Sequence, residues 1–235
     1  GDKIILIPPA IEDRGGILNK NSEKITILFM GSINNPRDFF IKGGLEVVKV
    51  FERLSKRDDV ELILRCNIPS EIKPKLTNFK NVKILNNLLP FDEVIEIYKN
   101  SDILLMPGHN YSITTFLEGM MFGLPIVALD TFGVMYLVKN GYNGIIINKS
   151  DKIKGYKDKT YPSIIRTDKF IREIKNYKDE KVIDRIVLSL EYLIENPQIL
   201  KKMSLHAREE FEKNYTIPVR NKALKKVFDE ALRSI

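Results

Sequence analysis

Short apolar runs alternate along this chain with longer segments in which apolar residues recur every three or four positions. The runs, rich in Ile, Val and Leu, cover residues 25–30, 60–66, 103–106, 126–129 and 145–147, with a further strand near Val82. The longer segments cover residues 45–54, 91–98, 112–121 and 134–139. This alternation predicts βαβ units, and strands that are apolar on both faces predict helices on both sides of a parallel sheet. The expected fold class is therefore α/β, with a doubly wound, Rossmann-like sheet.

The pattern weakens after the last predicted strand. Residues 149–181 are rich in Lys, Asp, Tyr and Ser, which predicts an exposed excursion rather than a separate domain. Three helical segments follow, over residues 182–194, 197–215 and 217–235. The last helix has one apolar stripe, formed by Val219, Leu224, Val227, Phe228 and Leu232. We therefore expect one domain over residues 1–215 and a distinct C-terminal helix over residues 216–235.

Composition narrows the class of protein. The chain has 235 residues, 43% of them hydrophobic, which is enough for a sizeable core. Its single cysteine, Cys66, excludes an internal disulfide and indicates folding in a reducing compartment. The 38 Lys and Arg residues outnumber the 31 Asp and Glu residues. This positive charge favours anionic partners such as nucleotides, phosphorylated lipids, membrane surfaces or nucleic acid. No apolar stretch approaches the roughly 18 residues of a membrane span. The opening Gly1-Asp2, in place of Met, predicts a fragment of a longer protein.

The loop after the first predicted strand is the first candidate site, because ligands of open parallel sheets bind beyond the carboxyl ends of the strands. Gly31, Arg37 and Lys42 lie in this loop, and Gly43-Gly44 precede an amphipathic helix. Glycines at a helix start let an anion approach free amides, and Lys42 adds a positive charge. The alternative is a flexible loop with two incidental cations. The spacing fits neither a P-loop nor a dinucleotide-binding glycine fingerprint.

The loop and helix after residue 106 form the second candidate site, with Ser112 as the expected N-cap. The first three amides of the helix, those of Ile113, Thr114 and Thr115, are then left without helical partners and would hold a phosphate. Glu118 lies one turn after Thr114 on the same helix face, where its carboxylate would accept hydrogen bonds from the hydroxyls of a ribose. The alternative is a capping box that starts at Thr115, in which Glu118 only satisfies a backbone amide.

The histidines and the cysteine do not form a metal-binding pattern. His109 is a candidate general acid/base or a polar loop residue, and we expect the latter. His206 is expected on the surface of a helix. Neither histidine has a second ligand at metal-binding spacing, and Cys66 is isolated. No metal ion or cofactor is therefore expected.

Six segments occur in the order and at the spacing of a known family. They are KIILIPPAI at residues 3–11, ILFMG at 27–31, KG at 42–43, DILLMP at 102–107, LEGMMFGLPIV at 117–127 and NGYNGIII at 140–147. In these segments the chain resembles the C-terminal, donor-binding lobe of the retaining family 4 glycosyltransferases (glycosyl transferases group 1), which have the two-lobed GT-B fold. The resemblance covers nearly the whole chain.

The resemblance implies a role for most of the candidate residues. Lys42 would contact the diphosphate of a nucleotide-sugar donor beside Gly31, and the amides at the start of the helix after Ser112 would hold the diphosphate oxygens. Glu118 would bind the nucleotide ribose, and the backbone at Leu89 would face the base.

Three positions depart from the family pattern. Asn110 stands where the family has a glutamate, eight residues before Glu118, and an amide hydrogen-bonds sugar hydroxyls but does not ionise. We assign Asn110 and Glu118 to the catalytic pair. The usual arginine after the first strand is Ser32, and Arg37 is expected to replace it from within the loop. Tyr136 stands where an acidic residue is frequent.

The resemblance also implies an activity and partners. A sugar would pass from a nucleoside-diphosphate donor to a hydroxyl acceptor with retention at the anomeric carbon, and the N-terminal acceptor lobe is absent from this chain. A glycan or lipid-linked acceptor is expected, with a cytoplasmic enzyme in peripheral contact with the inner face of a membrane. The isolated lobe would bind its donor but hardly turn it over.

Three rival functions remain open at this point. One is a sugar-nucleotide epimerase of the same fold, and another is a degenerate, non-catalytic binding module, which Asn110 suggests. The third is a nucleic-acid-binding domain, which is not expected because no basic patch interleaved with aromatic residues accompanies the positive charge.

Overall fold

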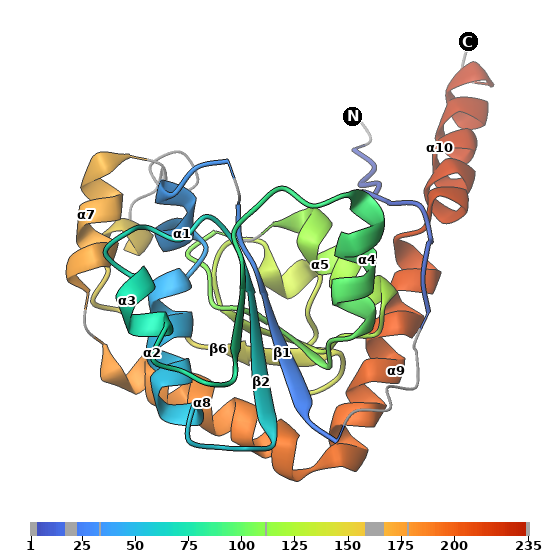
Figure 1. The fold of residues 1–235 in the computed structure, drawn as a ribbon. Helices are drawn as coiled ribbons and strands as arrows, with labels where there is room; N and C mark the ends of the chain where they lie inside the picture. The colour runs from blue at the N-terminus through green and yellow to red at the C-terminus, as the bar shows by residue number, and fades with distance from the viewer. Residues whose placement is uncertain are drawn as a thin grey trace.

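A parallel sheet forms the centre of the molecule (Figure 1). The computed structural model describes residues 4–16, 23–32, 34–110, 112–157, 167–177 and 179–233. In these residues six strands pair in the order β3-β2-β1-β4-β5-β6, and every neighbouring pair is parallel. The strands are β1 (Ile25–Met30), β2 (Val60–Arg65), β3 (Val82–Leu85), β4 (Ile103–Met106), β5 (Ile126–Leu129) and β6 (Gly144–Ile147). The predicted doubly wound α/β sheet is confirmed.

Helices cover both faces of this sheet. α2 and α8 lie on one side, and α4, α5 and α9 lie on the other (Figure 1). The helices are α1 (Arg37–Ile41), α2 (Gly44–Leu54), α3 (Lys73–Leu76), α4 (Phe91–Lys99), α5 (Ile113–Met121), α7 (Asp168–Asn176), α8 (Glu180–Glu195), α9 (Pro197–Asn214) and α10 (Ile217–Leu232). The described residues also form two short 3-10 helices, η1 (Val134–Tyr136) and η2 (Lys154–Lys157).

The core lies on both faces of the central strands. Ile27, Leu28 and Phe29 of β1 are completely buried, and β4 and β5 are buried along their whole length. Such continuous apolar strands, rich in branched side chains, are stable only when helices cover both faces. The sheet ends at β3 and β6, which are four residues long each.

The predicted helix over residues 134–139 is wrong. Only the short turn η1 forms there, because the side chain of Asn143 binds the backbone at the point where a helix would continue. Its Oδ1 accepts from the Lys139 amide at 2.7 Å, and its Nδ2 donates to the Leu137 carbonyl at 3.0 Å. The chain therefore turns directly into β6.

The predicted exposed excursion over residues 149–181 is also wrong in part. Residues 158–166 and 178 lie outside the described residues, but α7 forms between them and packs against α1. The side chain of Thr167 caps α7 by accepting from the Phe170 amide at 3.3 Å. Phe170, Ile171 and Ile174 are buried. Three apolar residues at helical spacing are enough to dock this short helix, although charged residues surround them.

The C-terminal helix stands apart from the sheet. α10 begins just after the buried Tyr215 and extends away from the body of the molecule (Figure 1). It buries no residue, and Val219, Phe228 and Leu232 of the predicted apolar stripe are exposed. The N-terminal segment runs beside the start of α10, where the Ile11 amide donates to the Tyr215 carbonyl at 3.0 Å.

Candidate functional site

The two segments predicted to bind phosphate touch each other at the carboxyl edge of the sheet. Lys42 ends α1, and Gly43 has a positive φ of 85° before α2 begins. A Cβ on Gly43 would lie 2.3 Å from the carbonyl oxygen of Pro107, directly after β4. The His109 amide donates to the Ile41 carbonyl at 2.8 Å. Glycine is therefore required at this turn both for its backbone conformation and for the close approach of the β4 loop.

The start of α5, which follows the β4 loop, offers backbone amides that lack helical partners. Ser112 is the N-cap, as predicted, with an extended backbone and without a side-chain cap of its own. The amides of the first helical turn therefore have no intrahelical acceptor and point out of the helix end, where they favour an anion. Ile113 and Thr114 are exposed at this end. The alternative of a capping box that starts at Thr115 is excluded, because Thr115 already lies inside the helix.

Glu118 is held by a partner that the sequence did not indicate. The hydroxyl of the buried Tyr98, on α4, donates to Glu118 Oε2 at 2.7 Å. Burial raises the pKa of the Glu118 carboxyl above its ordinary value, while the Tyr98 hydrogen bond and the positive charge of Arg65 oppose the rise. Burial and the Glu118 charge also raise the pKa of Tyr98. The Tyr98 hydrogen bond thus fixes the Glu118 carboxyl one helical turn from the amides at the start of α5.

Tyr98 and Arg65 are the residues that sequence reasoning missed. Tyr98 is part of the apolar stripe of a predicted helix, and Arg65 is the last residue of the buried strand β2. A hydroxyl in an apolar stripe and a charge at the carboxyl end of a strand are the only signals that the sequence offered.

Arg37 and Gly31 both follow β1 but contact different parts of the molecule. The guanidinium of Arg37 forms an ion pair with Asp168 on α7, and both side chains are at least half exposed. Gly31 follows β1, where a Cβ would lie 2.6 Å from the Cβ of Cys66. Burial raises the pKa of the Cys66 thiol to about 12. Gly31 is therefore required for packing at the carboxyl end of β1, and Arg37 contacts α7 in this structure.

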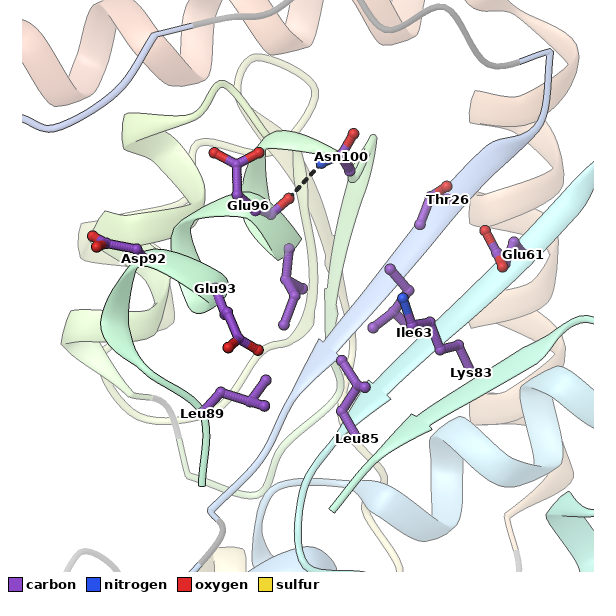
Figure 2. Close-up of a pocket in the computed structure, with 11 residues that line it drawn as sticks. Thr26, Glu61, Ile63, Lys83, Leu85, Leu89, Asp92, Glu93, Glu96 and Asn100 are labelled. Atoms are coloured by element: carbon purple, nitrogen blue, oxygen red, sulfur yellow. Dashed lines mark hydrogen bonds between the residues drawn. The ribbon is translucent and has the colours of Figure 1, made fainter. Parts of the chain in front are cut away.

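A large pocket lies between α4 and the strands β1, β2 and β3 (Figure 2). Its volume is about 590 Å³, and its walls include Ile63 and Leu85 of the sheet and Glu93 of α4. Leu89, the residue predicted to face a nucleotide base, lines this pocket. It is the only candidate site residue that does so, and the pocket is therefore distinct from the predicted phosphate site.

Asn110 and His109 are neighbours in the loop after β4 but differ in how far they are buried. Asn110 is half-buried, and its carbonyl lies close to Gly108. His109 lies in this loop, as predicted, but it is completely buried, which the sequence did not indicate. His206 is half-buried on α9, with its ring stacked on Tyr142 at a centroid distance of 3.8 Å.

The described residues contain no group of three or more His, Cys, Asp or Glu side chains arranged to hold a metal ion. Within the same part of the chain, none of the helices combines the length and the apolar character needed to cross a bilayer.

Comparison with known proteins decides the family. The family model described as Glycosyl transferases group 1 matches residues 24–161, which is more than half of the chain. The chain belongs to this family. The match includes the Lys42–Gly43 turn, the β4 loop and α5, so the segments that meet at the carboxyl edge are all family segments. No curated protein matches the sequence.

Solved glycosyltransferases have the same fold at low sequence identity. One, from Rickettsia africae, aligns with a TM-score of 0.65 and 16% identity over 91% of this chain and 49% of its own. The C-terminal domain of the group 1 protein LpcC from Francisella tularensis aligns with 0.59 and 14% over 82% and 87%. Anabaena HepE, solved with UDP-glucose, aligns with 0.59 and 14% over 88% and 49%.

These alignments show a Rossmann-like fold that matches the C-terminal domains of GT-B glycosyltransferases. The chain spans about half the length of the Rickettsia and Anabaena proteins and most of the Francisella domain.

Proposed function

We propose that this chain is the donor-binding lobe of a retaining, family 4-like GT-B enzyme, which transfers a sugar from a nucleoside-diphosphate sugar to a hydroxyl acceptor. The contact between the Lys42–Gly43 turn and the β4 loop carries the proposal. It places Lys42 against the loop that leads from β4 into α5, and Glu118 lies one turn into that helix. This is where ligands of open parallel sheets bind.

In the proposed reaction, negative charge develops on the leaving diphosphate as the bond to the sugar breaks. Lys42 and the amides of residues 113–115 stabilise this charge, because fixed positive dipoles that face the developing charge lower the barrier. No step of this proposal requires a metal ion. Glu118 accepts hydrogen bonds from the ribose hydroxyls and so fixes the nucleotide. Asn110 hydrogen-bonds the sugar.

The other half of the enzyme supplies the acceptor site in this proposal. The chain spans about half of two related enzymes, and α10 presents an uncovered apolar stripe after the domain that ends at residue 215. We propose that residues 216–235 cross onto an N-terminal lobe. A glycan or lipid-linked acceptor and action at the cytoplasmic face of a membrane complete the proposal, supported by the net charge of +7.

Calorimetric titration with UDP, GDP and ADP tests the donor site. We expect one of them to bind, with UDP the first choice because HepE was solved with UDP-glucose. Lys42→Ala and Glu118→Gln should each weaken binding about tenfold, the loss of one charge-assisted interaction. Lys225→Ala removes a positive charge from the exposed face of α10 and should change nothing. Failure of all three nucleotides to bind both this chain and the complete enzyme would contradict the proposal.

Asn110 supports a second candidate, a nucleotide-sugar-binding module that has lost its catalytic activity. An amide in place of a carboxylate removes an ionisable group from the sugar side of the site. Sugar transfer by the complete protein would exclude this candidate. A gain of activity in the Asn110→Glu variant of the complete protein would support it.

A further inference from the structure

His109 lies in a buried polar cluster outside the residues assigned above. Its imidazole is completely buried, and Nε2 lies 3.2 Å from Oε1 of Glu46 on α2, which is also buried. On the other side of the ring, Nδ1 forms a hydrogen bond with the hydroxyl of Tyr156, in η2. Phe170 of α7 packs edge-on against the imidazole at 6.2 Å between centroids.

The imidazole makes one hydrogen bond and one close contact with a carboxylate. Nδ1 forms the hydrogen bond with the Tyr156 hydroxyl, and Nε2 lies 3.2 Å from Oε1 of Glu46 without forming a hydrogen bond. A buried imidazole and a buried carboxylate are costly without partners, so each of these side chains depends on the other. The cluster is therefore specific in geometry, whereas an apolar side chain at residue 109 would pack in several ways.

His109 joins three elements that belong to different parts of the sequence. Its backbone ties the β4 loop to α1 through the hydrogen bond to Ile41, directly before Lys42. Its side chain ties the same loop to α2 through Glu46 and to residues 153–157 through Tyr156. Glu46 also lines a small cavity of about 10 Å³ with Tyr177 and Asp179, so the segment that follows α7 closes over it.

We propose that His109 is a positioning residue of the donor site. Held between Glu46 and Tyr156, it fixes the β4 loop against the Lys42–Gly43 turn, so that the lysine and the amides of α5 keep one spacing. This inference rests on the proposed donor-binding function. It assigns a role to residues 149–157 and 167–177, which supply Tyr156 and Phe170 on the side of His109 opposite Glu46.

Hydrogen exchange measured by mass spectrometry tests the positioning role without any ligand. His109→Leu should speed exchange of the amides of residues 107–116 and 42–44 about tenfold, and Tyr156→Phe about threefold, since a net hydrogen bond has about this value. His109→Gln keeps an amide donor for Glu46 and should restore most of the protection. The control is His206→Gln, because the second histidine stacks on Tyr142 away from the site.

Binding measurements separate positioning from general loss of structure. UDP should lose about fivefold in affinity in His109→Leu and Tyr156→Phe, while UMP, which lacks the second phosphate, loses less than about twofold. The double variant should lose no more than His109→Leu alone, because both changes break the same link. Glu118→Gln should weaken UDP and UMP equally, since both carry the ribose, and so reports on the proposed donor site independently of His109.

Unchanged exchange in both segments of Tyr156→Phe, together with unchanged exchange in a folded His109→Leu, would overturn the inference. The same conclusion would follow if Phe170→Leu, which removes only apolar packing from the ring, had as large an effect as Tyr156→Phe. If exchange changes as expected but no nucleotide binds, the donor-site proposal fails while the structural role of His109 stands.

Discussion

At the scale of single residues, Glu118, the proposed ribose-binding carboxylate, lies in an environment that disfavours its charged form. Its folded-state pKa is raised by burial, so ionisation of this carboxyl lowers the stability of the fold. The neutral carboxyl contributes to the stability of the fold. This contribution is fully present below the ordinary pKa of a glutamate and is lost as the pH rises through the raised pKa of Glu118. Such a conflict is typical of ligand-binding carboxylates, whose charged form is needed by the ligand rather than by the fold.

Glu118→Gln should therefore raise the melting temperature at pH 7 by about 2 °C while it weakens nucleotide binding. The gain should shrink toward pH 4, where the wild-type carboxyl is itself protonated. Thermal melts over this pH range measure the effect. Glu52→Gln, on the exposed face of α2, is the control and should show no gain. A lower melting temperature for Glu118→Gln at pH 7 would contradict this account of the site.

Comparison of Gly43 with Gly141 separates the cost of a strained backbone conformation from the cost of a steric overlap. Both have a positive φ, of 85° and 76°, but a Cβ on Gly141 meets nothing within 4 Å. Gly141→Ala should cost about 1 kcal/mol of unfolding free energy, the conformational penalty alone. Gly43→Ala should cost at least about 2 kcal/mol more, because its Cβ would overlap the Pro107 carbonyl. Urea unfolding measures both values, and equal losses would show that the turn can move.

At the scale of elements, two helix N-caps of similar type differ in their hydrogen bonds. Thr167 caps α7 through its side chain, whereas Ser112 makes no such bond to α5. Thr167→Ala should lower the free energy of unfolding by about 1 kcal/mol. Ser112→Ala should change it by less than half of that, because the Ser112 side chain accepts from no α5 amide that the substitution could release. A loss of 1 kcal/mol or more for Ser112→Ala in urea unfolding would disagree with this assignment.

Sequence reasoning succeeded where one local pattern determines an element. The apolar strands and the long amphipathic helices were predicted almost at their bounds, because burial on both faces and helical spacing are visible in the residues themselves. It failed at η1, where the side chain of Asn143 ends the predicted helix from outside it. It also failed at α7, where three buried residues lie in a charged segment. Lys42 and Glu118 were selected as candidates from local motifs. The contacts of Tyr98 with Glu118 and of His109 with Glu46 were not predicted, since they join residues far apart in the sequence.

At the scale of the whole molecule, α10 exposes apolar side chains that the proposed function assigns to contact with an N-terminal lobe. Phe228→Ser and Leu232→Ser should leave the melting temperature of this chain within about 1 °C, because both side chains are already exposed. In the complete enzyme the same changes should lower it by about 2–4 °C if the N-terminal lobe covers them.

Leu190→Ala is the matched control for this comparison. Its side chain is completely buried on α8, so it should destabilise both the chain and the complete enzyme by about 2–5 kcal/mol. A clear loss of stability for Phe228→Ser in this chain alone would show that α10 packs on the body of the lobe.

The short edge strands of the sheet have a consequence for behaviour at high concentration. β3 and β6 offer four residues each to a second chain, and on β6 the Ile146 amide already donates to the side chain of Asn140 at 2.9 Å. Strand-to-strand addition between folded molecules would gain few hydrogen bonds at either edge. We therefore expect fibrillar aggregation of this chain to begin from partly unfolded molecules, in which the longer β1 and β2 become accessible, and to follow the unfolding rate rather than the protein concentration alone.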